Sequence, residues 1–192
     1  MSNEQAKFGD SVEATVTRGA SQTDNIGLQG VYRAECFDAQ GNPKWSDTFK
    51  NLTTNVGRAN LMNSYFANTG GGAIVMGLKG TGSAAYTDTQ ASHGSWLEVG
   101  ATNAPTYSGT RKTPVFSAAT SANPSVLATS SAVTFTMTGS GTVAGAFINV
   151  GGTSAIDNTT GVLFSAGDFT AGAKVVASGD TINVSYTLSA AG

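Results

Sequence analysis

The chain has 192 residues, of which 40% are hydrophobic and 11% are charged, and its formal net charge is −2. This charge gives no electrostatic reason for direct binding to nucleic acid or to an anionic membrane surface. No apolar run approaches the ~20 residues that span a bilayer, and the first five residues lack the basic and apolar regions of a signal peptide. We therefore expect a protein made in the cytoplasm, with one large β domain or two small units.

Residues 1–29 are polar, contain glycine and show no sustained hydrophobic period, which predicts an extended arm. A short alternation at Val12, Ala14 and Val16 would form a strand only beside a partner edge. More than half of the charged side chains lie in the first sixty residues. We therefore expect an attaching N-terminal region, followed by a β body over residues 30–192.

Residues 31–50 predict a β-hairpin. A run of strand-forming residues is followed by the turn cluster Asp38–Pro43 and by a second run, Lys44–Lys50, that alternates apolar and polar side chains. The second run places two aromatic side chains on one face. With neighbours from the first strand and the next element, they form the predicted assembly contacts. These are Tyr32, Trp45, Phe49 and Arg58.

A helix is predicted at about residues 55–67. Thr53, Thr54 and Asn55 are suitable N-caps, and Gly70–Gly72 ends the pattern. Apolar side chains near one face predict that this face packs on the sheet. They are Val56, Ala59, Met62 and Phe66, with Leu61 and Tyr65 beside them.

Residues 79–112 are irregular and contain several glycines. Loop regions of this length are more often binding or assembly surface than core. We therefore predict that their aromatic and basic side chains are exposed contacts. The candidates are Tyr86, Trp96, Tyr107 and Arg111.

Residues 113–192 contain only four charged side chains and are rich in Gly, Ala, Ser and Thr. Residues 132–138 and 181–188 alternate cleanly, and turn signals recur roughly every 8–12 residues. We predict a mainly β fold, an antiparallel β-sandwich or jelly-roll-like domain with one short helix. Further short strands are predicted at residues 114–118, 142–150, 162–164 and 174–176.

Residue types that carry catalysis are scarce. Cys36 is the only cysteine and His93 the only histidine, which is too few for a structural zinc site, and no nucleophile-elbow motif surrounds the histidine. We therefore expect no enzyme activity, no metal and no cofactor. One alternative stays open: Asp88 and Glu98 share a loop region, and a glycosidase needs two nearby carboxylates.

Several segments together resemble a loosely defined family of tailed-bacteriophage virion proteins. They are Gly41–Gly57, Asn60–Phe66, Ala91–Glu98, Asn103–Arg111 and Ala177–Tyr186. The resemblance implies a structural protein of the head, collar or tail fibres and brings no catalytic residues with it. Residues 1–29 lie outside it.

On this resemblance we expect a capsid decoration or cement protein that clamps major-capsid subunits through its N-terminal region, in the virion and in several copies. The alternative is a head-fibre, collar or tail-fibre component whose loop aromatics stack on a host glycan. A hydrolase that uses Asp88 and Glu98 is the third alternative. Particle location separates the first two, because a shell protein is present in many more copies than a fibre at one vertex.

Overall fold

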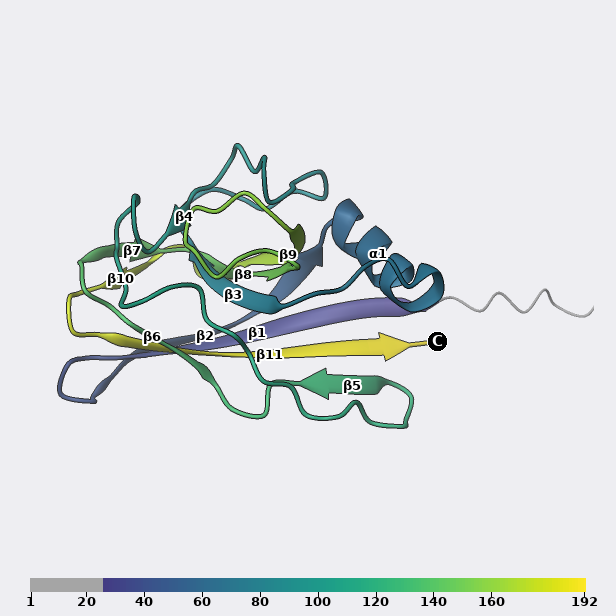
Figure 1. Ribbon diagram of the computed structural model, residues 1–192. Helices are drawn as coiled ribbons and strands as arrows, with labels where there is room; N and C mark the ends of the chain where they lie inside the picture. The colour runs from purple at the N-terminus through teal and green to yellow at the C-terminus, as the bar shows by residue number, and fades with distance from the viewer. Residues whose placement is uncertain (1–25) are drawn as a thin grey trace, which may run out of the picture.

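The computed structural model describes residues 26–192, and these residues form a mainly β, antiparallel sandwich (Figure 1). The fold class predicted from the sequence is therefore confirmed. Residues 1–25 of the predicted arm lie outside the described residues. Residues 27–29, also assigned to the arm, belong to the first strand and pair with the last one.

The helical residues are α1 (Asn55–Met62), which continues into a π-helical turn, η1 (Asn63–Ala67). No helix in the described part of the chain is long and apolar enough to cross a membrane. The strands are β1 (Gly27–Phe37), β2 (Pro43–Thr53), β3 (Ile74–Lys79), β4 (Glu98–Val99), β5 (Ser125–Ala128), β6 (Val133–Thr136), β7 (Gly141–Val143), β8 (Gly145–Val150), β9 (Val162–Asp168), β10 (Lys174–Val176) and β11 (Thr181–Ala191).

One nine-stranded sheet folds over itself to make both layers of the sandwich. Its order is β4-β3-β8-β9-β2-β1-β11-β5, with β6 also paired to β11. Strand β2 belongs to both layers, because residues 43–50 pair with β1 and residues 51–53 pair with β9. The first layer is β1, β11, β5 and β6, and the second is β9, β8, β3 and β4 (Figure 1).

At the point where β2 leaves β1, the side chain of Asn51 takes the place of strand pairing. Its Oδ1 accepts a hydrogen bond from the backbone N–H of Gly30 at 2.9 Å, and its Nδ2 donates to the hydroxyl of Tyr186 at 2.9 Å. Buried polar groups need such partners, because they have lost water. Asn51 therefore closes the corner at which one layer becomes the other.

The hairpin forms as predicted, with a register shift near its turn. The carboxylate of Asp38 accepts hydrogen bonds from the backbone N–H groups of Gln40 and Asn42, at 2.9 and 2.8 Å. Gly41 has a φ of 84°, which a glycine adopts without strain. Sequence and turn geometry therefore agree here.

Between the layers lies an aromatic core. The ring of Tyr32 stacks on Phe49 with centroids 5.2 Å apart, and lies 4.7 Å from the ring of Tyr186. Its hydroxyl meets Ser165 Oγ of the second layer at 2.9 Å. Tyr32 and Phe49 are thus buried, and their prediction as assembly contacts is wrong, because the aromatic face of the hairpin is the core face.

Cys36 also lies inside this core, beside Asp180. Burial raises the pKa of its thiol to about 11, and the negative charge of Asp180 acts in the same direction. Cys36 is therefore a free, buried cysteine on β1.

The C-terminal strands follow the predicted alternation. Val133 and Phe135 of β6, and Ile182 and Val184 of β11, are buried. The predicted strand 114–118 is absent; this segment makes an isolated bridge from Phe116 to Thr129 and lies along β5. Strand β9 runs to Asp168, further than the predicted 162–164.

The helix forms where predicted, but its apolar face does not pack on the sheet. Thr54 caps it, accepting a hydrogen bond from the N–H of Gly57 at 2.9 Å. Gly57 is the residue of α1 that is buried, and it lies so close to β9 that a Cβ there would be 2.2 Å from the carbonyl oxygen of Phe164. The helix therefore meets the sheet through backbone, which leaves its large apolar side chains outside.

We predict that Gly57→Ala destabilises the protein. In an ordinary helix this change stabilises by roughly 0.5–1 kcal/mol. Here the new methyl group would overlap the Phe164 backbone, so α1 must shift, and we expect a net loss of about 1–3 kcal/mol in denaturant unfolding. The control is Gly94→Ala, where an added Cβ meets nothing within 4 Å. A stabilised Gly57→Ala protein would contradict this description of the contact.

We predict opposite effects of removing two buried tyrosine hydroxyls. Tyr107 carries the one buried side-chain polar atom within residues 26–192 that has no hydrogen-bond partner, so Tyr107→Phe should stabilise by about 1 kcal/mol. Tyr186→Phe leaves the Asn51 amide unpaired and should destabilise by a similar amount. Chemical unfolding at pH 7 measures both changes. Changes in unfolding free energy of the same sign for the two variants would contradict the prediction.

The same pair has a pH signature. Burial raises the pKa of both tyrosines above the ordinary value, which is about 10 in an unfolded chain. Their titration therefore leaves stability unchanged below that pH and lowers it above that pH, because the unfolded state ionises before the folded state does. Tyr107→Phe should make the loss of stability above about pH 10 less steep.

Candidate functional site

Three residues predicted as exposed loop contacts are buried: Trp96, Tyr107 and Arg111. The expectation of exposure is wrong because these side chains point inward: Tyr107 joins the main core beside Phe135, whereas Trp96 and Arg111 lie over Phe147 on the outer face of the second layer. Trp96 packs against Phe147 there, in a second apolar cluster with Leu163 and Ala166. A part of this region around Trp96 therefore forms a third layer over the sandwich, while many of its other residues are exposed.

The covering loops are held by a buried ion pair between Glu98 and Arg111. The Arg111 Nε and Nη2 donate to the two carboxylate oxygens at 2.8 and 2.6 Å. Arg111 Nη2 also donates to the carbonyl of Asn158 at 2.7 Å, and the N–H of Asp157 donates to Glu98 at 2.9 Å. The pair thus connects the 79–112 loops with the loop that follows β8.

A second buried cation holds the start of the same region. Lys79 is fully buried at the end of β3, forms an ion pair with Asp168 and donates to the carbonyl of Gly82 at 2.6 Å. Its ammonium group also lies 5.5 Å from the ring of Trp96. Both buried cations therefore stabilise loop structure.

The two carboxylates of the hydrolase alternative have structural partners. Asp88 accepts hydrogen bonds from Trp96 Nε1 and from the N–H of Ala85, both at 2.9 Å, and Glu98 is engaged by Arg111. Both carboxylates are buried. The geometry therefore offers this alternative no free acid and base from these two residues.

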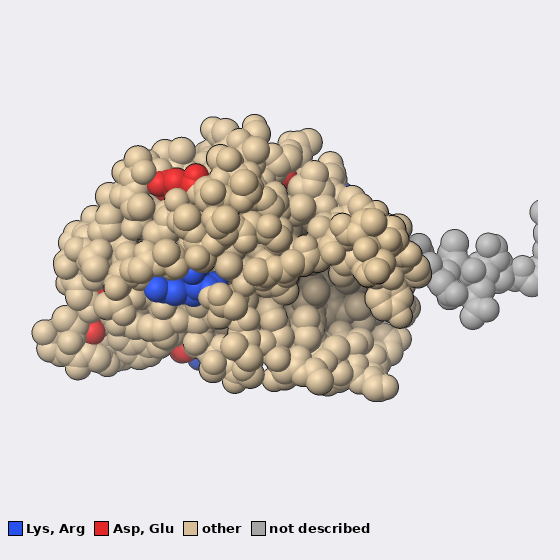
Figure 2. All heavy atoms as spheres, viewed as in Figure 1, with Lys and Arg blue, Asp and Glu red and all other residues tan. Residues whose placement is uncertain are grey.

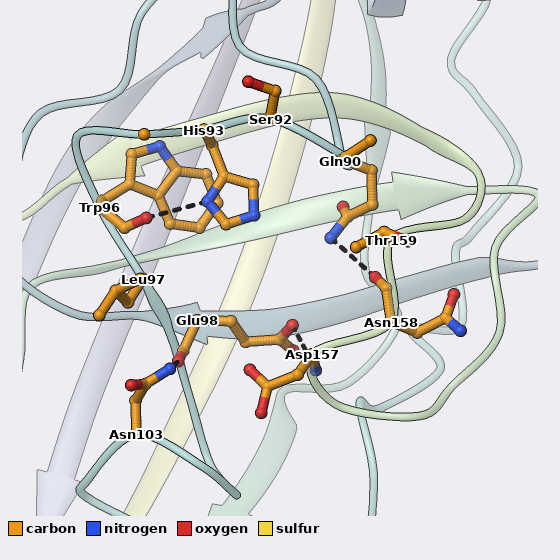
Figure 3. A pocket seen from close by; sticks show the side chains of 12 residues that line it. Gln90, Ser92, His93, Trp96, Leu97, Glu98, Asn103, Asp157, Asn158 and Thr159 are labelled. Atoms are coloured by element: carbon orange, nitrogen blue, oxygen red, sulfur yellow. Dashed lines mark hydrogen bonds between the residues drawn. The ribbon is translucent and has the colours of Figure 1, made fainter.

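A shallow pocket of about 350 Å³ lies between these loops (Figure 3). His93 stacks on Trp96 with ring centroids 3.9 Å apart, and its Nδ1 is 2.9 Å from the Trp96 carbonyl oxygen. The amides of Gln90 and Asn103 donate to the carbonyls of Asn158 and Glu98 across the pocket. Its polar groups mainly join loop to loop, and within residues 26–192 no three metal-ligating side chains cluster.

Two of the predicted contacts lie together on the surface. The guanidinium of Arg58 lies 5.4 Å from the ring centroid of Tyr86, and both side chains are exposed. Trp45 is half-buried; its Nε1 donates to the Val175 carbonyl at 3.1 Å, and its ring meets Phe169 edge-on. The eight predicted contacts thus do not form one site.

The main apolar surface feature is the outer face of the helix. Met62, Tyr65 and Phe66 are 63%, 82% and 81% exposed, and the two aromatic rings meet edge-to-face with centroids 5.1 Å apart. We call these three residues the aromatic ridge. The sequence pattern identified Met62 and Phe66 as apolar face residues but assigned them to the core.

Beside the ridge lies an apolar groove of about 210 Å³. One wall is the helix with the glycines that follow it, and the rest comes from the ends of both layers. Figure 2 shows the hollow below the helix, with no charged side chain coloured around it. The lining residues include Leu61, Ile74, Leu127, Val150, Phe164 and Leu188.

Sequence reasoning missed the groove, because its walls come from several segments that are far apart in the chain. The ridge and the groove together form an uncharged surface at one end of the sandwich, where β1 begins and β11 ends (Figure 1). Exposed apolar surface of this kind marks sites of association.

Comparison with known proteins finds no matching family model, no similar curated protein and no similar solved structure. The functional argument therefore starts from the geometry of the surface.

We predict strong coupling between Glu98 and Arg111. Arg111→Met leaves a buried carboxylate without its cation and should cost about 3–5 kcal/mol of unfolding free energy. The double change Glu98→Gln with Arg111→Met should cost clearly less than the sum of the two single changes, as a double-mutant cycle measures. Arg33→Met, which removes an exposed pair with Glu35, is the control and should change little. Additive effects would contradict the role given to the buried pair.

Proposed function

We propose that this protein is a non-enzymatic structural protein of a bacteriophage virion, a decoration or cement protein that attaches to major-capsid subunits. The observation that carries the proposal is the aromatic ridge of Met62, Tyr65 and Phe66, exposed on a helix that a close backbone contact fixes to the sandwich. Attachment to a shell requires an apolar surface on a rigid body, and exposed aromatic and methionine side chains are typical of interface centres. The resemblance of separate segments between Gly41 and Tyr186 to virion proteins points the same way.

The proposed contact surface differs from the one expected from the sequence. Phe49 lies in the core and Trp45 is half-buried against Phe169, so the hairpin offers little apolar surface to a partner. The ridge provides it instead. We propose that the protein is assembled in the host cytoplasm, resides on the virion and acts in several copies.

The alternative of a head-fibre, collar or tail-fibre component is favoured by one observation, the exposed ring of Tyr86. It borders a polar surface hollow together with Asn51, Thr53 and Arg58. An aromatic ring beside hydrogen-bonding groups suits stacking on a sugar. Trp96 and Tyr107 no longer support this alternative, because both are buried.

We predict that Tyr65→Ser with Phe66→Ser weakens attachment to capsids at least tenfold, because two large apolar side chains no longer leave water on binding. Co-sedimentation with particles assembled without the protein measures the attachment. Because both residues are exposed, the thermal unfolding of the variant should change little. The matched control is Val175→Ser, which removes an exposed apolar side chain from β10.

Equal occupancy of the variant and wild type on particles would overturn the role of the ridge. Attachment of a few copies at one vertex, with adsorption to host cells lost in Tyr86→Ser, would favour the fibre alternative instead.

A further inference from the structure

The groove exists because the first layer extends beyond the second. Leu188 of β11 pairs with Gly30 on one side and Leu127 on the other, and both leucines line the groove. In the second layer β3 begins only at Ile74, paired with the last residue of β8. The inner face of the first layer therefore extends beyond the end of the second layer, and the helix lies beside this uncovered part.

The groove is large enough to receive side chains of a partner. Interiors leave few voids larger than a water molecule, and an apolar cavity of about 150 Å³ already binds benzene. The groove, at about 210 Å³, has room for several apolar side chains. Its lining carries no charged residue, so an occupant must present an apolar edge.

The chain enters the described structure close to the groove. Gly27 pairs with Ala191, three residues along the strands from the pair of Gly30 and Leu188, a separation of roughly 10 Å. Ile26, directly before it, is 78% exposed. Twenty-five further residues precede Ile26, and an extended chain places Val16 up to about 33 Å from it, far enough to reach a neighbouring molecule.

Within those residues, one stretch has the chemistry that the groove requires. Val12, Ala14 and Val16 alternate with Glu13 and Thr15. In an extended conformation the first three side chains share one face over about 13 Å, and the two polar side chains lie on the other. That face can enter an uncharged groove while Glu13 stays in water.

We propose that the apolar groove of one copy receives residues 12–16 of a neighbouring copy, so that copies are linked by exchanged N-terminal segments. A neighbouring copy is within reach because β1 begins at the outer end of the sheet (Figure 1) and an extended segment spans up to about 33 Å, and the crosslinking below distinguishes it from the chain's own groove. The inference rests on the proposed function only in that decoration places copies side by side.

Self-association of the full chain provides the first test, by sedimentation equilibrium. Wild type should associate, and Val12→Asp with Val16→Asp should weaken association at least tenfold, because two apolar side chains lose their burial. Thr15→Asp is the matched control, on the opposite face of the segment, and should stay within about twofold of wild type. A monomeric wild type, or an unchanged Val12→Asp with Val16→Asp variant, overturns the proposal.

Crosslinking identifies the occupant. A full chain with Ala14→Cys, mixed with a tagged full chain carrying Leu127→Cys, should form a disulfide between the two chains on oxidation. Glu13→Cys, which faces away from the groove, should crosslink far less. A chain carrying both Ala14→Cys and Leu127→Cys that links only to itself at concentrations at which wild type associates overturns the exchange between copies.

The remaining outcomes are also decisive. If Tyr65→Ser with Phe66→Ser abolishes self-association while Val12→Asp with Val16→Asp does not, the ridge of a second copy is the partner and the proposal fails. Self-association is measured without capsids, so a loss of self-association can be distinguished from a loss of attachment to particles. Either result can therefore occur without the other.

Discussion

The sandwich depends on strand β2, which belongs to both layers. Its stability therefore depends on how the backbone groups are satisfied where β2 passes from one layer to the other. Where β2 turns from β1 to β9, two strands separate and backbone pairing ends. Asn51 bridges Gly30 and Tyr186 there, through both ends of one amide. The hydroxyl of Tyr32 adds a bond to Ser165 of the second layer. These neutral hydrogen bonds hold the corner together, so it does not rely on charge.

The surface at one end follows from a second constraint, the close approach of α1 to β9. A glycine at position 57 lets the helix backbone reach the carbonyl of Phe164. A helix that docks through its backbone turns its bulky residues outward, which produces the aromatic ridge and leaves the groove open beside it. Three charged side chains elsewhere, Lys79, Glu98 and Arg111, are buried and hold loops in place. Within residues 26–192, this end of the molecule therefore exposes large apolar side chains.

The sequence predicts what local periodicity determines. The hairpin, the helix position and the alternation of β6 and β11 all follow from residue order. It does not predict the burial of Trp96 or Arg111, because Trp96 packs on Phe147 of β8 and Arg111 is bonded to the distant carbonyl of Asn158 as well as to Glu98. One signal was present: Gly145–Val150 is nearly continuous in small and apolar residues, as in strands covered on both faces. The groove has no counterpart in any single stretch of sequence.

Cys36 has a consequence for the proposed association between copies of this protein. Thiol oxidation and disulfide exchange proceed through the thiolate, and a pKa of about 11 leaves very little thiolate near neutral pH. The sulfur is also enclosed between the layers. Copies that pack against one another would therefore not become joined by a disulfide through Cys36. Their association would be non-covalent and reversible, and it would depend on concentration.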